Sequence, residues 1–196
     1  MRRQNGKSYD RIVAIDPDTK RPGYSVFNRG KLEEHGIIPY RNGPATMRDA
    51  FPWFMDTLAE RADALIIEDQ FIPPGKTERA KSIISLAVSR GKLEIFFEMK
   101  RVRICRVMGY RWQNEVLTSG RGRGKRSLKR SDAKAASIRV ASEIAGTEIK
   151  NPDVADAICI GSFFARLYSI HGNLAFDIAS DTKKREKRIR VIKRAR

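Results

Sequence analysis

The stretch that most constrains the fold is RIVAIDPDTKRPGYSVF, at residues 11–27. Its first part, Arg11–Ile15, is mainly apolar and β-branched and predicts a buried strand that ends at Asp16. The segment DPDTKRPG is typical of a tight turn, and Tyr24–Phe27 predicts a second strand. A carboxylate that a rigid turn holds at a strand end is well placed for metal or phosphate chemistry. Taken alone, Asp16 is more simply explained as a turn cap, so its role depends on the rest of the chain.

Further strands and helices follow in a definite order. We expect strands at Lys31–Ile38, Ala64–Ile67 and Val102–Val107, and helices at Thr46–Arg61, Glu78–Met99, Ser131–Ala145 and Pro152–Tyr168. The first three strands are predicted to form an antiparallel meander because short turns join them. The order is three strands, a helix, a strand, a long helix, a strand and two helices. It is the order of an α/β RNase H-like fold, a mixed five-stranded sheet flanked by helices on both faces.

Three local features carry more specific expectations. Pro52 is predicted to confine the regular part of the first helix mostly to the residues after it, because proline has no backbone N–H. Ser131 and Asn151 are the predicted N-caps of the last two helices. The segment Gly109–Thr118 predicts an irregular connection after the fifth strand.

The net charge of +17 is concentrated in two short segments. Residues 183–196 contain nine Lys or Arg and one Glu, and residues 120–134 contain seven Lys or Arg and one Asp. Two separate basic segments favour nucleic acid over an anionic membrane as the partner, and such binding weakens steeply with salt. The tail alone could instead be a solvated segment without a ligand. We expect a flexible basic arm at 1–10, one domain at 11–172 with a basic loop at 119–130, and a basic tail at 173–196.

The sequence shows no membrane or export signal. No apolar run approaches the roughly 20 residues needed to cross a bilayer, and the start MRRQNGKSYD lacks the apolar core of a signal peptide. We therefore expect a cytoplasmic protein without a membrane partner. Cys105 and Cys159 stand alone in apolar runs, which predicts two small buried side chains and neither a disulfide nor a metal pair.

Four carboxylates stand where they could meet. Asp16 ends the first strand and Glu68 the fourth, so their exits share one edge of the sheet if these strands are parallel neighbours. Asp153 and Asp156 are three residues apart at the start of the last helix, where the positive helix end stabilises both on one face. Oxygen ligands without His or Cys favour Mg²⁺, or Mn²⁺ in its place, over zinc. Two such ions about 4 Å apart can activate a water and stabilise the leaving oxygen of a phosphodiester.

Each acid alone is more simply a cap or a surface charge. As a set, however, clustered carboxylates repel one another unless a cation joins them, which favours a metal site. Asp18 and Asp69 neighbour two of the four, and we expect a turn or surface role for both.

The segments AIDPDTKRPGYSV, IIEDQFI and NPDVADAICIG, in this order, make the sequence resemble the RuvC-type Holliday junction resolvases. The resemblance spans residues 11–166 in organisation, and these three segments are its specific part. It implies a magnesium-dependent endodeoxyribonuclease that binds a four-way DNA junction as a homodimer and nicks two symmetry-related strands. Such an enzyme works in the cytoplasm of a bacterial or phage-infected cell. In this resemblance the four catalytic, metal-binding acids are Asp16, Glu68, Asp153 and Asp156.

The same resemblance assigns DNA contacts. Phe71, three residues after Glu68, matches the aromatic residue that the family inserts into the junction centre, although it could also be a core residue. Lys134 matches a basic residue that contacts the scissile phosphate, and Lys129 lies nearby. The family usually has another lysine after the fifth strand, where this chain has RWQNEV, so we expect Arg111 to take that place. The basic loop, an addition that would broaden the range of branched DNA, supplies Arg121, Arg123, Lys125, Arg126 and Arg130.

Three other functions fit parts of the sequence. RNA-processing nucleases of the YqgF type share a turn like TKRPG, although the Asp153/Asp156 pair and Phe71 favour the junction reading. A non-catalytic nucleic-acid-binding protein would use the basic loop and tail, but it would not need four acids. A sugar-kinase or actin-like ATPase would need two lobes, for which the chain is too short.

Overall fold

A computed structural model describes residues 10–39, 45–69, 80–117 and 129–171, and the structural statements below refer to these residues. Residues 1–9 of the predicted arm, most of the predicted basic loop and the predicted tail at 173–196 lie outside them. The element order is β1 (Arg11–Asp16), β2 (Gly23–Asn28), β3 (Lys31–Ile37), α1 (Ala45–Glu60), β4 (Ala64–Asp69), α2 (Ala80–Met99), β5 (Arg103–Met108), α3 (Gly109–Val116), α4 (Arg130–Ala145) and α5 (Pro152–His171).

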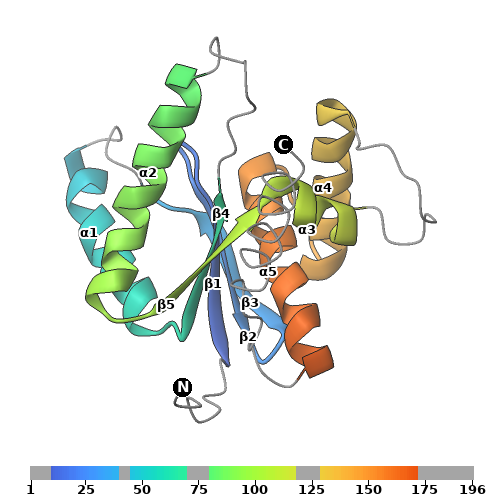
Figure 1. Cartoon of the computed structure of the whole chain (residues 1–196), viewed down its shortest axis with the longest axis horizontal. Helices are drawn as coiled ribbons and strands as arrows, with labels where there is room; N and C mark the ends of the chain where they lie inside the picture. The colour runs from blue at the N-terminus through green and yellow to red at the C-terminus, as the bar shows by residue number, and fades with distance from the viewer. Residues whose placement is uncertain (1–9, 40–44, 70–79, 118–128, 172–196) are drawn as a thin grey trace, which may run out of the picture.

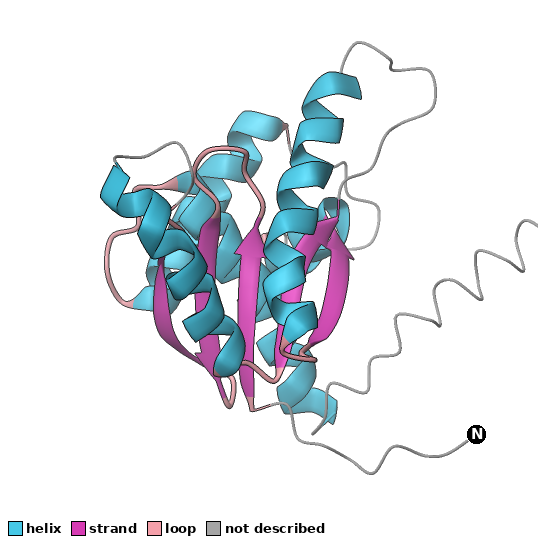
Figure 2. Cartoon of the chain, turned by 90° about the vertical axis from the view of Figure 1, so that its left-hand side faces the viewer, coloured by secondary structure: helices cyan, strands magenta, loops and turns pink. Residues whose placement is uncertain are grey.

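The five strands form one mixed sheet in the order β3-β2-β1-β4-β5. β1, β2 and β3 are an antiparallel meander, whereas β4 is parallel to β1 and β5 is parallel to β4. Helices α1 and α2 cover one face of the sheet, and α3, α4 and α5 cover the other (Figures 1 and 2). The predicted α/β class with a five-stranded mixed sheet between two helical layers is confirmed.

Alternation along the strands divides the apolar residues between two cores. In β1, Ile12 and Ala14 face the α5 side, while Val13 and Ile15 face the α2 side. β4 repeats the pattern, with Ala64 and Ile66 toward α5 and Leu65 and Ile67 toward α2. Because side chains in a strand alternate between faces, the next residues in each strand have a fixed direction as well. Asp16 and Glu68 continue the α5 side, and Asp69 continues the α2 side.

Three local predictions were wrong. Helix α1 starts before Pro52 and runs through it, with the proline ring on the exposed side, where water can satisfy the carbonyl that lost its partner. The predicted irregular connection is helix α3, which buries Trp112 and Val116, four residues apart on one face. Ser131 is not an N-cap, because α4 begins at Arg130 and the Ser131 hydroxyl donates to Asp132 instead.

Other local predictions are confirmed. Asn151 caps α5, since its Oδ1 accepts hydrogen bonds from the backbone N–H groups of Asp153 and Val154 at 2.9 and 3.1 Å. Cys105 and Cys159 are free and buried. None of the helices in the described parts of the chain is long and apolar enough to cross a membrane.

Candidate active site

Two of the four acids meet because β1 and β4 are parallel neighbours. Ile15 pairs with Ile67 in the register, so the next residues, Asp16 and Glu68, lie at the neighbouring C-terminal ends of β1 and β4, at the upper edge of the sheet in Figure 1. Both continue the series of side chains that faces α5. The sequence prediction that these two strand exits lie side by side is confirmed.

The other two acids reach this edge because α5 packs unusually closely on the sheet. Gly23 pairs with Asp16 across β1 and β2, and a Cβ added to Gly23 would lie 2.0 Å from the carbonyl oxygen of Asp153. Only glycine permits this approach. Farther along, the Ser25 hydroxyl donates to the carbonyl of Ala157 at 2.8 Å and fixes the same contact. The first turn of α5 is therefore held directly above Asp16.

The four carboxylates lie close enough to disfavour one another's ionisation. Burial raises the pKa of Asp16 well above its usual range, and nearby charges raise it further, those of Glu68, Asp156, Asp153 and Asp18. Burial also raises the pKa of Glu68 to about 7 and that of Asp156 to about 6, and it raises the pKa of Asp153. Shared negative charge in a desolvated place is unfavourable until a cation balances it.

Glu68 is oriented by α3. The indole N–H of Trp112, which is fully buried, donates to Glu68 Oε2 at 2.9 Å. On the other side of the carboxylate, a Cβ added to Gly109 would lie 2.8 Å from Oε1, so this glycine makes room for the acid. The hydrogen bond lowers the pKa of Glu68 but does not offset the effect of burial. One oxygen of Glu68 is thus held by the protein, and the other stands in a space that glycine leaves open.

Asp156 is oriented by α4. The buried hydroxyl of Ser137 donates to Asp156 Oδ1. Lys134 lies one turn earlier on the same helix, and its positive charge partly offsets the rise in the pKa of both Asp153 and Asp156. The ammonium group of Lys134 is therefore near the acids, while its side chain is exposed to solvent.

Asp18, only two residues after Asp16, is in the opposite electrostatic state. Burial would raise its pKa, but hydrogen bonds from backbone N–H groups outweigh this effect and lower it. Its Oδ1 accepts from the N–H of Lys20 at 2.7 Å and of Arg21 at 2.9 Å. The carboxylate of Asp18 thus stabilises the turn, which agrees with the role expected for it.

The donor set suits a hard divalent cation, although the side chains are not yet gathered around one point. Among the described residues, no group of three or more His, Cys, Asp or Glu side chains stands in an arrangement that would hold a metal ion. The four acids supply only oxygen atoms, their pKa values are raised, and Gly109 leaves space beside Glu68. These residues fit Mg²⁺ or Mn²⁺, and the four-acid metal site stays a prediction.

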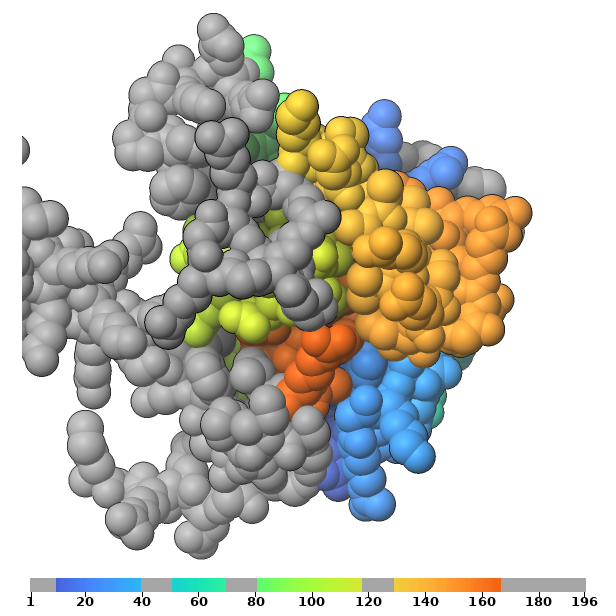
Figure 3. Space-filling model, turned by 90° about the vertical axis from the view of Figure 1, so that its right-hand side faces the viewer, coloured from blue at the N-terminus to red at the C-terminus, as the bar shows by residue number. Residues whose placement is uncertain are grey.

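The predicted DNA contacts are only partly described. Lys129, Arg130 and Lys134 are exposed at the start of α4, which forms the surface beside α3 in Figure 3. Arg111 lies in α3 and is half-buried. The others, Phe71, Arg121, Arg123, Lys125 and Arg126, lie outside the described residues.

Four residues that shape the site were not identified from the sequence. Gly23 was assigned to a turn, yet it begins β2 and serves the close approach of α5. Trp112 and Gly109 belong to a helix that was not expected, although the spacing of Trp112 and Val116 could have indicated it. Ser137 follows Lys134 by three residues, so a shared helical face could have connected the two.

Comparisons with known proteins bear on the fold. No family model matches the chain, and no curated protein matches it in sequence. RuvC from Thermus thermophilus superposes with a TM-score of 0.54 at 16% sequence identity, over 83% of this chain and 97% of that one. T. thermophilus RuvC in complex with its Holliday junction substrate gives a TM-score of 0.53 at 17% identity, over 80% and 95% of the two chains. The chain has the fold of RuvC.

The shared fold covers nearly the whole of RuvC, so the sheet and both helical layers are included. It confirms the RNase H-like architecture that the order of strands and helices predicted. At this level of identity the likeness concerns the backbone, and the roles of individual side chains have to come from the chain's own geometry.

Proposed function

We propose that the protein is a structure-selective DNA endonuclease that resolves Holliday junctions by paired, symmetric nicks and depends on divalent metal ions. The observation that supports this proposal is that acids from β1, β4 and α5 lie near one edge of a RuvC-like sheet, close enough for Glu68, Asp156 and Asp153 to raise the pKa of Asp16. T. thermophilus RuvC, which shares the fold, binds a Holliday junction substrate. The concentrated positive charge of the chain favours the same class of partner, and the basic additions extend it to other branched DNA.

In this proposal Asp16, Glu68, Asp153 and Asp156 hold Mg²⁺, with Mn²⁺ as a substitute. When bound, such ions lower the pKa of an attacking water and stabilise the departing oxygen of the phosphodiester. The protein contributes orientation. Trp112 fixes one oxygen of Glu68, and Ser137 fixes one oxygen of Asp156, so the remaining oxygens keep their direction.

The basic residues of α4 position the DNA. Lys134 is close enough to the acids to affect their pKa values and is exposed, so it can contact a phosphate whose ester bond lies over the carboxylates. Lys129 and Arg130 extend the positive charge away from the site along the start of the same helix. Their phosphate contacts make the binding dependent on ionic strength.

A second copy of the chain is proposed to bind at the outer face of α2. Three apolar side chains there are more than half exposed, Ile84 (56%), Val88 (52%) and Ile95 (51%), at the helical spacing of one stripe. Between them Gly91 has no atom within 4 Å of an added Cβ, which leaves room for a helix to cross. Paired nicks need two sites, and a two-fold dimer matches the two-fold symmetry of a four-way junction.

A cleavage assay tests this function. Purified protein is incubated with a four-way DNA junction, a flap, plain duplex and structured RNA, with Mg²⁺ and with EDTA. We expect paired nicks in the junction with Mg²⁺ only, and binding without nicking by the Glu68→Gln variant. Preferred cleavage of structured RNA, binding that ignores Mg²⁺ without any nicking, or full activity of Glu68→Gln would each overturn the proposal.

A further inference from the structure

The middle of α2 contacts both strand exits that carry the candidate acids. The Ser89 hydroxyl donates to the backbone carbonyl of Asp18 at 2.8 Å, in the turn that follows Asp16. The next residue, Arg90, donates from Nη1 to the carboxylate of Asp69, which follows Glu68 at the end of β4. Two consecutive residues of one helix therefore hold the ends of β1 and β4 from the face opposite α5.

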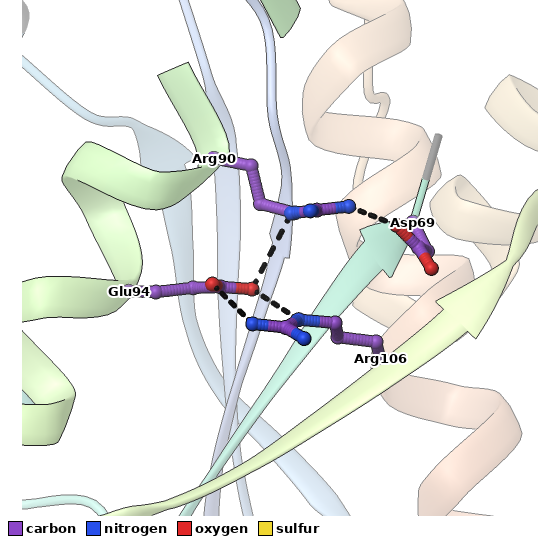
Figure 4. A network of polar contacts seen from close by, with 4 residues as sticks. All are labelled: Asp69, Arg90, Glu94 and Arg106. Carbon is purple, nitrogen blue, oxygen red and sulfur yellow. Dashed lines mark hydrogen bonds and ion pairs between the residues drawn. The ribbon is translucent and has the colours of Figure 1, made fainter. Parts of the chain in front are cut away.

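Arg90 belongs to a network of two acids and two arginines, which Figure 4 shows between α2, β4 and β5. Glu94 is nearly fully buried, and Arg106 of β5 donates to both of its oxygens at 2.8 Å. The Nε of Arg90 lies 3.5 Å from Glu94 Oε1 but makes no hydrogen bond among the described residues. The hydrogen bond that Arg90 makes in this network is thus directed at Asp69.

The charges of the network show which of its contacts are needed to neutralise the buried acid. Two acids and two arginines neutralise each other, and Arg106 alone already satisfies both oxygens of Glu94. Buried ion pairs of this kind add little net stability relative to apolar packing, but they hold a fixed geometry. Arg90 is consequently not required to neutralise Glu94. Its contact with Asp69 instead fixes the position of the end of β4.

The contact between Arg90 and Asp69 also affects the orientation of Glu68. In a strand, consecutive side chains point to opposite faces, so Asp69 faces α2 while Glu68 faces α3 and α5. Fixing the Asp69 side chain fixes the backbone of the last residues of β4, because one peptide unit joins the two residues. The direction of the Glu68 carboxylate is thereby set from both sides, by Trp112 on one face and by Arg90, through Asp69, on the other.

We propose that Arg90 is a positioning residue for the metal site, which acts through Asp69 on Glu68. Ser89, the residue before Arg90, holds the turn after Asp16 in a similar way, through its hydrogen bond to the carbonyl of Asp18. The proposal rests on the function proposed above, since it takes Glu68 as a metal ligand. Partners that orient metal ligands typically contribute about 10–100-fold to metal affinity.

The test measures metal binding without DNA, by titrating Mn²⁺ and following the free ion by its EPR signal. Glu68→Gln defines the binding that belongs to this site. We expect Arg90→Met to weaken that binding about tenfold, and Arg90→Lys, which keeps the charge, to recover part of the loss. Asp69→Asn should give a loss similar to that of Arg90→Met. The double variant should bind no worse than either single variant, because both act along one path.

Lys100→Met is the matched control. Lys100 also pairs with two carboxylates, Asp56 and Glu60, just after the other end of α2, so its loss should leave Mn²⁺ affinity unchanged. If Arg90→Met binds Mn²⁺ within twofold of the wild type, or if the losses of Arg90→Met and Asp69→Asn multiply, the positioning role is wrong. If the wild type binds no Mn²⁺ that Glu68→Gln removes, the proposed function fails instead.

Discussion

Glu68 and Asp69 are consecutive residues of β4, yet their carboxylates lie in opposite electrostatic surroundings. Toward α5, Glu68 lies near Asp16 and Asp156, and its pKa rises to about 7 because of burial. Toward α2, Asp69 pairs with Arg90, and the neighbouring Glu94 is held by Arg106 (Figure 4). One face of the strand end gathers negative charge, and the other cancels it.

The difference separates two uses of acidic residues. On the α2 face each carboxylate has a guanidinium partner, which is what an acid needs when it serves as scaffold. On the α5 face the charge of the exposed Lys134 only partly offsets the rise in pKa of two acids. Acids that the fold brings together without balancing them are suited to a ligand that brings positive charge.

The largest effect is expected when one acid on each face of the strand end is neutralised. Asp16→Asn should reduce junction cleavage more than about 100-fold, beyond the loss typical of residues that only orient ligands, while junction binding survives. In the metal-free protein the same change should raise the free energy of unfolding by roughly 1 kcal/mol, because it relieves repulsion. For a chain of this length that corresponds to a rise in Tm of about 2–4 °C.

Asp69→Asn is the matched substitution on the other face. It removes the partner of Arg90 and should lower the free energy of unfolding by roughly 0.5–1 kcal/mol, since the pair is partly exposed. Cleavage should persist at saturating Mg²⁺. Thermal unfolding in EDTA measures both variants. Shifts of the same sign would show that the two faces do not differ in charge balance.

The second prediction concerns the glycine that lets α5 reach the acids. In Gly23→Ala the new methyl would lie 2.0 Å from the carbonyl oxygen of Asp153. The overlap should lower stability by about 1–3 kcal/mol and, by moving Asp153 and Asp156, reduce cleavage up to about 100-fold. Chemical unfolding and the junction assay measure the two effects.

Gly161→Ala controls for packing alone. Its added Cβ would meet the ring of Phe27 at 2.4 Å, in the middle of α5 and away from the acids. Gly161→Ala should therefore lose about as much stability as Gly23→Ala but should keep its cleavage activity. If both variants lose cleavage in equal proportion to stability, the close approach at Gly23 has no special link to the site.

The sequence was sufficient to predict those features of the site that depend on local patterns. The two apolar runs predicted that Asp16 and Glu68 lie at neighbouring strand ends, and Asn151 predicted the start of α5. Local patterns could not predict contacts between residues that are far apart in the sequence. Nothing local relates Arg90 to Asp69, or Gly23 to the backbone of Asp153, because these contacts arise only when helices pack on the sheet. The spacing of Trp112 and Val116 could have indicated helix α3, but the hydrogen bond from Trp112 to Glu68 arises only when the helix packs beside β4.

A third, smaller effect is expected at Trp112. Trp112→Phe keeps an aromatic ring in the core but removes the N–H that donates to Glu68. We expect about a tenfold loss of Mn²⁺ affinity, together with a higher pKa for Glu68, because that hydrogen bond lowers it. Trp53→Phe, at an exposed side chain, should change neither quantity. Unchanged Mn²⁺ binding by Trp112→Phe would mean that this hydrogen bond does not orient the Glu68 carboxylate for the metal.

A last prediction concerns the pH dependence of the stability of the metal-free protein. Burial raises the folded-state pKa of Glu68 to about 7, above its usual 4.5, so the folded protein holds a proton that the unfolded chain has already released. The associated stability is fully present below pH 4.5 and is lost as the pH rises through 7. The free energy of unfolding of wild type minus that of Glu68→Gln should thus fall, on the order of 1–2 kcal/mol, between pH 5 and pH 8. Taking the difference between the two proteins removes the contribution of acids with lowered pKa values, such as Asp18, whose slope has the opposite sign. Urea unfolding in EDTA at several pH values measures it, and a difference that rises with pH would show that Glu68 is already balanced by the protein.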